Sequence, residues 1–295
     1  MITASIVTHH TDPTELDRCA SLVLRSPEVA HLYIIDNSRD HSLRDMVEKI
    51  ANRIRESARA DEAADRISYT HVENRGYGAG HNVAIRQSME SGAEAHLVLN
   101  ADTWWEEDVI TRMVRYMRAN PDVGMMMPKV YYPDGDLQLT ARCLPTPVDL
   151  FAKRFLPKSL IRRRMDRYLL VRADHDRIIN SPYLLGSFLL IRREALETVG
   201  IFDERFFMYP EDIDMTRRVH RHYRTILYPE VSIIHHHAAA SRRNIKMLRI
   251  HIANMCRYFC KWGWIFDSER RAMNRQLLAN LPMLPADTPT PPSRG

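Results

Sequence analysis

Long apolar runs are absent from this sequence of 295 residues. No stretch approaches the about 18 consecutive apolar residues that a transmembrane helix requires, so the sequence predicts no membrane span. The first seven residues also lack the basic segment with which a signal peptide begins. Their apolar, β-prone character predicts a first strand instead, and we expect a cytoplasmic protein.

Cysteine is scarce as well, with four residues scattered along the chain. They are too few and too dispersed for a disulfide framework, and they fit reduced thiols in a cytoplasm. Cys256 and Cys260 lie four residues apart on an expected helix. Because no second pair follows at the spacing of a metal site, we interpret them as packing residues and not as zinc ligands.

Apolar and charged residues are present in the proportions of an ordinary globular protein, at 45% and 27%. The formal net charge of +5 implies acidic partners. Nucleic acid, anionic lipid and phosphorylated substrates are all compatible with that charge.

Short apolar runs alternate with helical patterns in the first hundred residues. The expected order is strand, helix, strand, helix, strand, helix, strand over residues 2–8, 14–25, 32–35, 42–64, 67–72, 79–91 and 97–99. This alternation predicts an α/β fold with a mostly parallel sheet and right-handed crossovers. Further along we expect a helix at 104–118 and strands at 123–127, 184–191, 226–228 and 231–234.

Three of these strands end in polar, ligand-capable residues. Asp36-Asn37-Ser38 follows the second strand, Asn74-Arg75-Gly76 the third, and Asn100-Ala101-Asp102 the fourth. In open α/β sheets the ligand crevice lies beyond the carboxyl ends of the strands. A carboxylate there suits a hard divalent cation that carries phosphates. The pattern therefore predicts a nucleotide site.

Two of these motifs also have plainer explanations. Asn100-Ala101-Asp102 could cap a helix that starts near Trp104. The glycines at 76, 78 and 80 open a helix whose N–H groups could meet an anion, or they simply permit a tight turn. Their spacing matches neither a dinucleotide fingerprint nor a P-loop.

Residues 132–181 lose the regular pattern. Prolines interrupt this segment, and its part from 153 to 172 holds eight Lys and Arg residues against one Asp. We expect a mobile insertion over the site, on the side of an acceptor. A solvated basic face is the default interpretation. Contact with an anionic membrane or a lipid diphosphate is the sharper alternative.

A second carboxylate cluster begins at Pro210, which favours a helix start. Glu211 and Asp212 then lie in the first helical turn, where the helix dipole favours negative charge. Asp214 is expected to pair with an arginine three or four residues later and to be structural.

Three consecutive histidines follow the last expected strand, at 235–237. Because alternate strand residues point to opposite faces, at most two of them share a side. Ligand spacing for zinc is lacking. The prediction is that one histidine joins Asp102 around a cation while neutral.

The C-terminal region begins with an amphipathic helix, whose apolar face packs on the core or lies in a membrane interface. The residues of that face are Leu248, Ile252, Met255, Phe259 and Trp262. From residue 281 the chain is rich in proline, and we expect a disordered tail over 281–295.

In this order, the strand-end motifs, Gly186-Ser187, Glu211-Asp212 and His235 resemble the family-2 glycosyltransferases. The resemblance runs from about residue 2 to 264, and the bacterial rhamnosyltransferase-like members that build surface polysaccharides are the most similar. It implies a GT-A fold, which is a Rossmann-like, mostly parallel sheet flanked by helices. The catalytic domain would span 1–240, with the insertion at 132–181, and a helical extension would span 241–280.

The resemblance also implies residue roles. Asp212 matches the catalytic base, with Glu211 beside it as the alternative. Asp102 and His235 match the surroundings of a divalent cation, Mg²⁺ or Mn²⁺. Asn100 replaces the first carboxylate of the family's D-x-D element, and one fewer negative charge weakens the expected hold on the cation. Positions that match the binding of the nucleotide-sugar donor are Thr8, Asp36, Asn37, Asn74, Arg75, Gly76, Asn82, Asn100, Ala101, Asp102 and Gly186.

The function so implied is inverting transfer of a sugar to a hydroxyl of a lipid-linked oligosaccharide or polysaccharide acceptor. The expected donor is dTDP-rhamnose, or else a UDP-hexose. The protein would be cytoplasmic or peripheral on the inner face of the cell membrane, and a homo-oligomer stays open.

Two other classes were weighed. A sugar nucleotidyltransferase would have a glycine-rich loop near the N-terminus, and residues 5–11 hold no glycine. A basic nucleic-acid-binding protein fits the charge. However, carboxylates at three strand ends would repel a phosphate backbone, so we expect no nucleic-acid partner.

Overall fold

The computed structural model describes residues 1–295 apart from 42, 58–65, 151–157, 237–244, 286, 289 and 291–295. Within the described residues, one sheet of nine strands runs in the order β3-β2-β1-β4-β10-β6-β11-β5, and β8 pairs with β11. Those strands are β1 (Ile2–Thr8), β2 (Val29–Asp36), β3 (Ile67–His71), β4 (Ala95–Leu99), β5 (Thr103–Trp104), β6 (Val123–Tyr131), β8 (Ile179–Asn180), β10 (Phe188–Arg192) and β11 (Arg224–His235).

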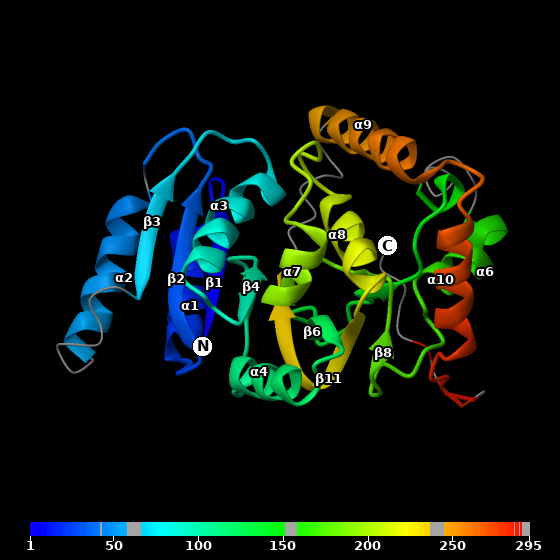
Figure 1. Cartoon of the computed structure of the whole chain (residues 1–295), viewed down its shortest axis with the longest axis horizontal. Helices are drawn as coiled ribbons and strands as arrows, with labels where there is room; N and C mark the ends of the chain where they lie inside the picture. Colours follow the sequence, from blue (N-terminus) through cyan, green and yellow to red (C-terminus); the bar gives the residue numbers. More distant parts are fainter. Residues whose placement is uncertain are drawn as a thin grey trace.

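The sheet is mixed. β1 pairs in parallel with β2 and β4, and β2 pairs in parallel with β3. β10 enters antiparallel between β4 and β6, and β11 returns parallel to β6. The parallel half carries the helices α1 (Pro13–Arg25), α2 (Arg44–Ser57) and α3 (Tyr77–Glu90), which lie around the blue and cyan strands in Figure 1. This half confirms the predicted alternation and places the ends of β1, β2 and β4 along one edge.

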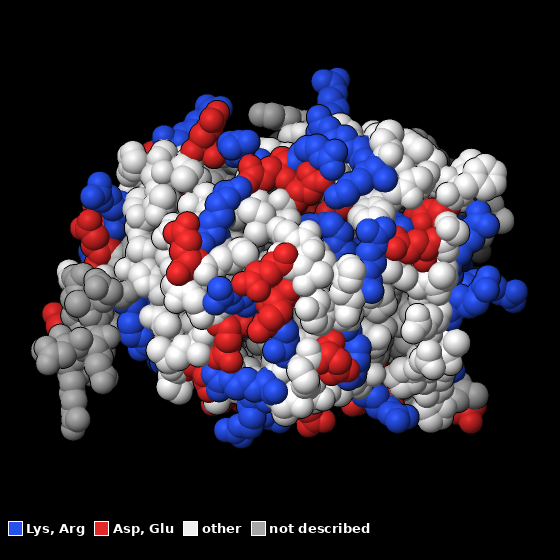
Figure 2. Space-filling model, in the orientation of Figure 1, with Lys and Arg blue, Asp and Glu red and all other residues white. Residues whose placement is uncertain are grey.

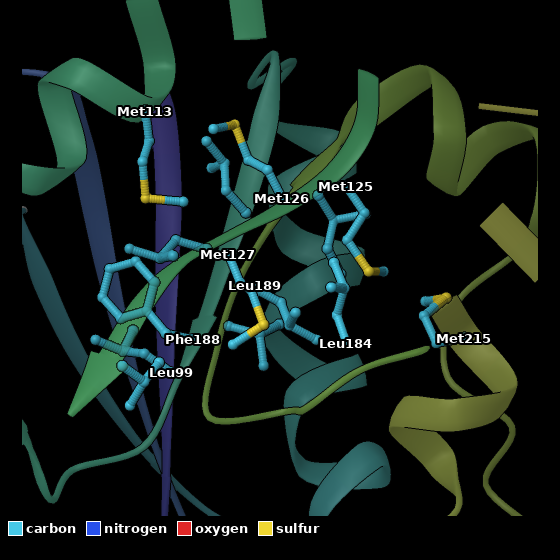
Figure 3. Close-up of a cluster of buried hydrophobic side chains, with 14 of the residues drawn as sticks. Leu99, Met113, Met125, Met126, Met127, Leu184, Phe188, Leu189 and Met215 are labelled. Carbon is cyan, nitrogen blue, oxygen red and sulfur yellow. The ribbon is translucent and has the colours of Figure 1, made fainter. Parts of the chain in front are cut away.

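The central strands are buried on both faces. Met125, Met126 and Met127 of β6 are each fully buried, although neighbouring side chains of a strand point to opposite sides. Figure 3 shows these methionines between Met113 of α4 (Val109–Ala119) and Met215 of α8 (Glu211–His220). Flexible thioethers fill irregular gaps well, so this cluster joins the two halves of the sheet in one core.

The helix expected from residue 104 begins later. α4 starts at Val109, with Asp108 as its N-cap accepting from the Thr111 N–H (3.3 Å). Thr103 and Trp104 instead form β5, which pairs with the end of β11. The Arg18 guanidinium lies over the Trp104 ring at 3.8 Å. The helix-cap explanation for Asn100-Ala101-Asp102 is therefore wrong, because these residues form the turn between two strands.

The segment 132–181 is attached to the fold at several points within its described residues. β7 (Ala141–Arg142) pairs with β9 (Tyr183–Leu184), and β8 pairs with β11. The helix α6 (Lys158–Tyr168) carries exposed arginines. Part of the basic run, 151–157, lies outside the described residues. The mobility of this insertion stays a prediction.

Further helices among the described residues are α7 (Arg193–Val199), α9 (Ile245–Trp262) and α10 (Ser268–Ala279). α9 spans the upper edge in Figure 1, and α10 lies beside α6 at one end. Met255 and Phe259 of the predicted apolar face are buried, whereas Ile252 is 40% exposed. In the described helices, none combines the length and the apolar content needed to cross a bilayer. The tail's Leu284 N–H donates to the Arg172 carbonyl (3.0 Å), so its first residues are packed.

Candidate active site

Asp36 lies at the end of β2, where its carboxylate is hydrogen-bonded to Thr8 at the end of β1. It is fully buried and accepts hydrogen bonds from the Thr8 hydroxyl (3.0 Å), the Ser38 N–H (2.9 Å) and the Tyr69 hydroxyl (2.6 Å). Burial by itself would raise the pKa of Asp36, but the bonds from Tyr69, Ser38 and Thr8 outweigh it and lower the pKa. Asp36 is thus held as an anion, and Thr8 is its partner.

The loop after β3 fits tightly against residues 202–209. Gly76 has φ of 107°, and a Cβ there would lie 2.2 Å from the Phe207 carbonyl oxygen, so only glycine fits. The Asn74 side chain accepts from the Gly76 N–H (3.1 Å) and fixes the turn. Asn37 donates to the Gly76 carbonyl (3.4 Å), and its own Oδ1 is buried without a partner among the described residues.

Arg75 and Asn82 both reach Glu204. The Arg75 side chain is 67% exposed and lies 3.4 Å from the Glu204 carboxylate. Asn82 is fully buried, and its amide bonds both the N–H and the carbonyl of Phe202 (2.9 Å each) and the Glu204 carboxylate (3.0 Å). Asn82 therefore holds the 202–204 loop against α3. Arg75 is the predicted donor-site residue of this loop that faces solvent.

The turn after β4 brings Asp102 to the late histidine. Asp102 Oδ1 lies 3.3 Å from His235 Nε2, and Asn100 Nδ2 lies 3.4 Å from the same nitrogen. Ala101, which lies between Asn100 and Asp102 in the sequence, is buried. His235 itself is 2% exposed and pairs by backbone with Thr103. The structure thus brings together the two residues that the sequence predicted around a cation.

Gln138 fixes the tautomer of that histidine. Its Nε2 donates to the His235 carbonyl (2.7 Å), and its Oε1 lies 3.1 Å from His235 Nδ1. An amide oxygen only accepts, so Nδ1 carries a proton, and Nε2 is the ring nitrogen that faces Asp102.

A carboxylate oxygen and an imidazole nitrogen fit a divalent cation such as Mn²⁺. Within the described residues, no group of three or more His, Cys, Asp or Glu is placed to hold a metal. Asp102 and His235 are the described residues that could contribute ligands to a cation shared with bound phosphates.

The imidazole of the next histidine, His236, points away from this site. His236 Nδ1 lies 2.9 Å from Glu15 on the surface, which follows from strand alternation. His237 is outside the described residues. His235 is therefore the histidine of this run that faces Asp102.

Asp212 lies opposite the Gly186 turn, at the start of α8. Its Oδ2 accepts from the Gly186 N–H (3.0 Å) and its Oδ1 from the Ile213 N–H (2.7 Å). A Cβ on Gly186 would lie 3.1 Å from the Asp212 Cβ, so the close approach favours glycine. Burial raises the pKa of Asp212 to about 7, against the lowering effect of the two backbone bonds.

Glu211 is the less suitable anion of the pair. It is 5% exposed, and its Oε2 has no hydrogen-bond partner among the described residues. Burial, and then the charge of Asp212, raise its pKa well above the ordinary value. Asp214 is buried too, but it is bound by Arg218 (2.8 Å) as the i, i+4 pattern predicted. The expected pairing with an arginine is confirmed.

Tyr77 joins the two carboxylate clusters, and the sequence reasoning missed it. Its hydroxyl lies 2.9 Å from Asn100 Oδ1 and 2.7 Å from the Gly186 carbonyl. Burial raises its pKa, and so do the charges of Glu211, Asp212 and Asp102. These carboxylates thus surround one side chain. An aromatic residue between two glycines was the only available signal.

Arg142 was missed as well. Its guanidinium lies 5.7 Å from the centre of the Tyr183 ring, and its charge lowers the pKa of Asp212. It comes from the irregular segment after residue 132, where no periodic pattern points to a site. The same holds for Gln138.

Comparison with known proteins agrees with this geometry. The family model "Glycosyl transferase family 2" matches residues 5–200, and the chain belongs to that family. An N-acetylglucosaminyl-diphospho-decaprenol L-rhamnosyltransferase of Mycobacterium tuberculosis is 29% identical over 186 residues, covering 58% of this chain and 59% of the relative. The hexosyltransferase Agl10 of low-salt glycan biosynthesis in Haloferax volcanii is 27% identical, covering 68% and 57%. The matches span less than two thirds of these relatives.

Solved structures share the fold. The mannosyltransferase PcManGT of Pyrobaculum calidifontis, in complex with GDP-Man and Mn²⁺, superposes with a TM-score of 0.56 at 17% identity, over 94% of this chain and 74% of that chain. GalNAc-T7 with UDP, GalNAc and Mn²⁺ gives 0.57 at 14% identity, over 80% and 43%. The fold is GT-A, as predicted.

Proposed function

We propose that this protein is an inverting glycosyltransferase that moves a sugar from a nucleotide donor to an acceptor hydroxyl in one displacement. The observation that carries the proposal is the environment of Asp212. This carboxylate is buried at a helix start, has a pKa near 7, and is kept available as an anion by two backbone N–H groups. A general base works best when its pKa lies near the working pH.

In this proposal Asp212 takes the proton of the acceptor hydroxyl while that oxygen attacks the anomeric carbon. The bond from that carbon to the diphosphate breaks on the opposite face, and the electron pair leaves with the nucleotide. Glu211, whose pKa is raised by burial and by the charge of Asp212, would stay neutral beside the base. Arg142 limits how far burial raises the pKa of Asp212.

The donor would lie along the ends of β1, β2 and β4. Asp36 and Asn37 would face the nucleoside end, and Arg75 at the Gly76 turn would face the diphosphate. Asp102 and His235 would hold Mg²⁺ or Mn²⁺, which supplies positive charge for the leaving group when bound. The names of the relatives favour transfer of rhamnose or a hexose to a lipid-linked acceptor. The proposed donor is dTDP-rhamnose or a UDP-hexose, and contact with the inner face of a membrane is part of the proposal.

Thermal unfolding with a panel of nucleotides tests the donor class. The panel is dTDP, UDP, GDP and CDP, each with and without Mn²⁺. A ligand that binds only the folded chain raises the melting temperature. We expect a shift with dTDP or UDP that grows when Mn²⁺ is present. The absence of any shift across the panel would contradict the proposal.

A further inference from the structure

The turn between α9 and α10 displays three large apolar side chains to solvent. Trp264 is 40% exposed, Ile265 69% and Phe266 88%. We call these three residues the apolar tip. Fully solvated apolar side chains of this size are costly when clustered, and contiguous exposed apolar patches mark interaction sites.

The apolar tip is held in a defined shape. Arg270, itself only 3% exposed, donates to the carbonyls of Gly263 (3.4 Å) and Trp264 (3.1 Å). Arg271 donates to the Ile265 carbonyl (3.1 Å). The Trp264 ring also lies 5.3 Å from the buried Phe259 ring. The side chains are thus presented outward by an ordered backbone, which lowers the entropic cost of binding.

Basic groups border the apolar tip on the α9 side. A cavity of about 440 Å³ is lined by Arg205, Phe206, Arg257, Cys260 and Lys261. Asp203 pairs with Arg205 (2.6 Å) and Lys261 (2.8 Å). Arg257 instead donates to the neutral amide oxygen of Asn254 (2.7 Å). Positive charge therefore remains on the last turns of α9, which lead into the tip, and Figure 2 shows blue side chains along this upper edge with red ones below them.

A second basic group lies on the other side. The Arg270 guanidinium also reaches the Pro145 carbonyl (3.4 Å), so Pro145 lies close to the backbone of the tip. Arg164 of α6 pairs with Asp149, four residues after Pro145 (2.5 Å). α6 also carries the exposed side chains of Arg162 and Arg163. These arginines belong to the basic run at 153–172, for which the sequence analysis gave contact with an anionic membrane as an alternative.

We propose that the apolar tip and its basic borders dock the protein on an anionic lipid bilayer. The tip would enter the interface between headgroups and acyl chains, and the arginines of α6 and α9 would face lipid phosphates. Charge complementarity favours a bilayer over a second copy of this chain, because two copies would bring like charges together. The proposal rests on the proposed function in one respect, since a lipid-linked acceptor is presented at such a surface.

Vesicle co-sedimentation of the full chain tests the docking without any need for transfer. We expect binding to vesicles of phosphatidylcholine with phosphatidylglycerol, and much weaker binding to phosphatidylcholine alone. Phe266→Ser should weaken binding about tenfold or more, and Arg257→Glu about fivefold. The matched controls are Met283→Ser, where the side chain is 58% exposed beyond the far end of α10, and Arg44→Glu on α2. Both should bind like the unaltered protein.

Equal binding of the tip variant and the unaltered protein would overturn the proposal. So would a Phe266→Ser change that leaves vesicle binding intact but converts a dimer to a monomer in sedimentation velocity, since the tip would then be a protein interface. Transfer to a short, water-soluble acceptor should be unchanged in Phe266→Ser. If vesicle binding depended on the tip but no nucleotide raised the melting temperature of the protein, the docking would be supported and the proposed function contradicted.

Discussion

Asp36 and Asp212 are both buried aspartates, and the protein treats them in opposite ways. Asp36, at the end of β2, accepts bonds from two hydroxyls and one N–H, and its pKa is lowered. Asp212, at the start of α8, accepts from two N–H groups and lies beside Glu211, and its pKa is raised to about 7. The first is fixed as an anion, whereas the second is set to exchange a proton.

The difference lies in the balance between desolvation and donors. Burial raises the pKa of a carboxyl group by a similar mechanism at both places. At Asp36 a third donor, the Tyr69 hydroxyl, completes the compensation. At Asp212 the donors are fewer, and burial outweighs both the backbone bonds and the lowering charge of Arg142. A fixed anion suits a binding or framework role, and a carboxyl group with a pKa near neutrality suits a base.

The largest test of this contrast is Asp212→Asn. The amide cannot take the acceptor proton, so we expect transfer to fall by about a thousandfold or more. Nucleotide-induced thermal shifts should stay within about twofold in apparent affinity, because the amide oxygen of the variant can still accept from the N–H of Gly186, the expected donor residue that Asp212 contacts. Steady-state transfer and thermal unfolding measure the two effects.

The matched control is Glu211→Gln, which removes the neighbouring acid and leaves Asp212 in place. It should retain far more activity than Asp212→Asn. If Asp212→Asn turned over normally and Glu211→Gln did not, the base would be Glu211 and not Asp212.

A third carboxylate, Asp102, belongs to the proposed cation site together with His235. Replacement of its partner, His235→Ala, should weaken the Mn²⁺-dependent part of the nucleotide thermal shift by about 10- to 100-fold in Mn²⁺ concentration. His236→Ala is the control, since that imidazole faces Glu15. An unchanged Mn²⁺ requirement in His235→Ala would remove this histidine from the proposed cation site.

Much of this arrangement was predictable from the sequence. The alternation of apolar runs predicted the parallel half, and strand ends marked Asp36 and Asp102 because parallel strands end at one edge. His235 was predicted with them, although only alternation along β11 and the contact with Gln138 separate it from His236.

The rest depends on tertiary contacts that have no local pattern. Tyr77 acquires its position only when the turns at Asn100 and Gly186 meet. Arg142 and Gln138 lie in the irregular segment, where spacing carries no information. The start of α4 was misplaced by five residues because the pairing of Thr103 with β11 overrides local helix signals.

The pH dependence of transfer tests the assignment of Asp212 as the base. Asp212 must lose its proton to act, so the rate should rise with pH and level off above about 7, with about a tenfold change per pH unit well below that value. Asp36→Asn should keep the same profile, because burial, backbone bonds and the charge of Arg142 set the pKa of Asp212. A profile that is flat between about pH 5 and pH 8 would contradict the assignment.

The two aspartates should also give the stability of the fold opposite dependences on pH. Because folding lowers the pKa of Asp36, its stabilising effect is complete above the ordinary value of 3.8 and is lost as pH falls through the folded value. Because folding raises the pKa of Asp212, stability falls as pH rises from about 4 to about 7.

Asp36→Asn should therefore lower the melting temperature at pH 7 by roughly 4–8 °C, from the loss of about 2 kcal/mol of charged hydrogen bonding. Asp212→Asn should raise it by about 2–4 °C. Melting curves from about pH 3 to pH 8 measure both variants. Identical pH dependence in the two would mean that the buried carboxyl groups do not differ as described.

The smallest expected effect concerns the donor that distinguishes the two sites. Tyr69→Phe removes the hydroxyl that bonds Asp36 Oδ2 and leaves the ring in place. The cost should be about 1–2 kcal/mol at pH 7, and the acid limb of the stability curve should move to higher pH, because the pKa of Asp36 rises when a donor is lost. Tyr33→Phe, on the same strand as Asp36, serves as a control without a bond to it. An unchanged acid limb in Tyr69→Phe would show that Thr8 and Ser38 alone keep Asp36 ionised.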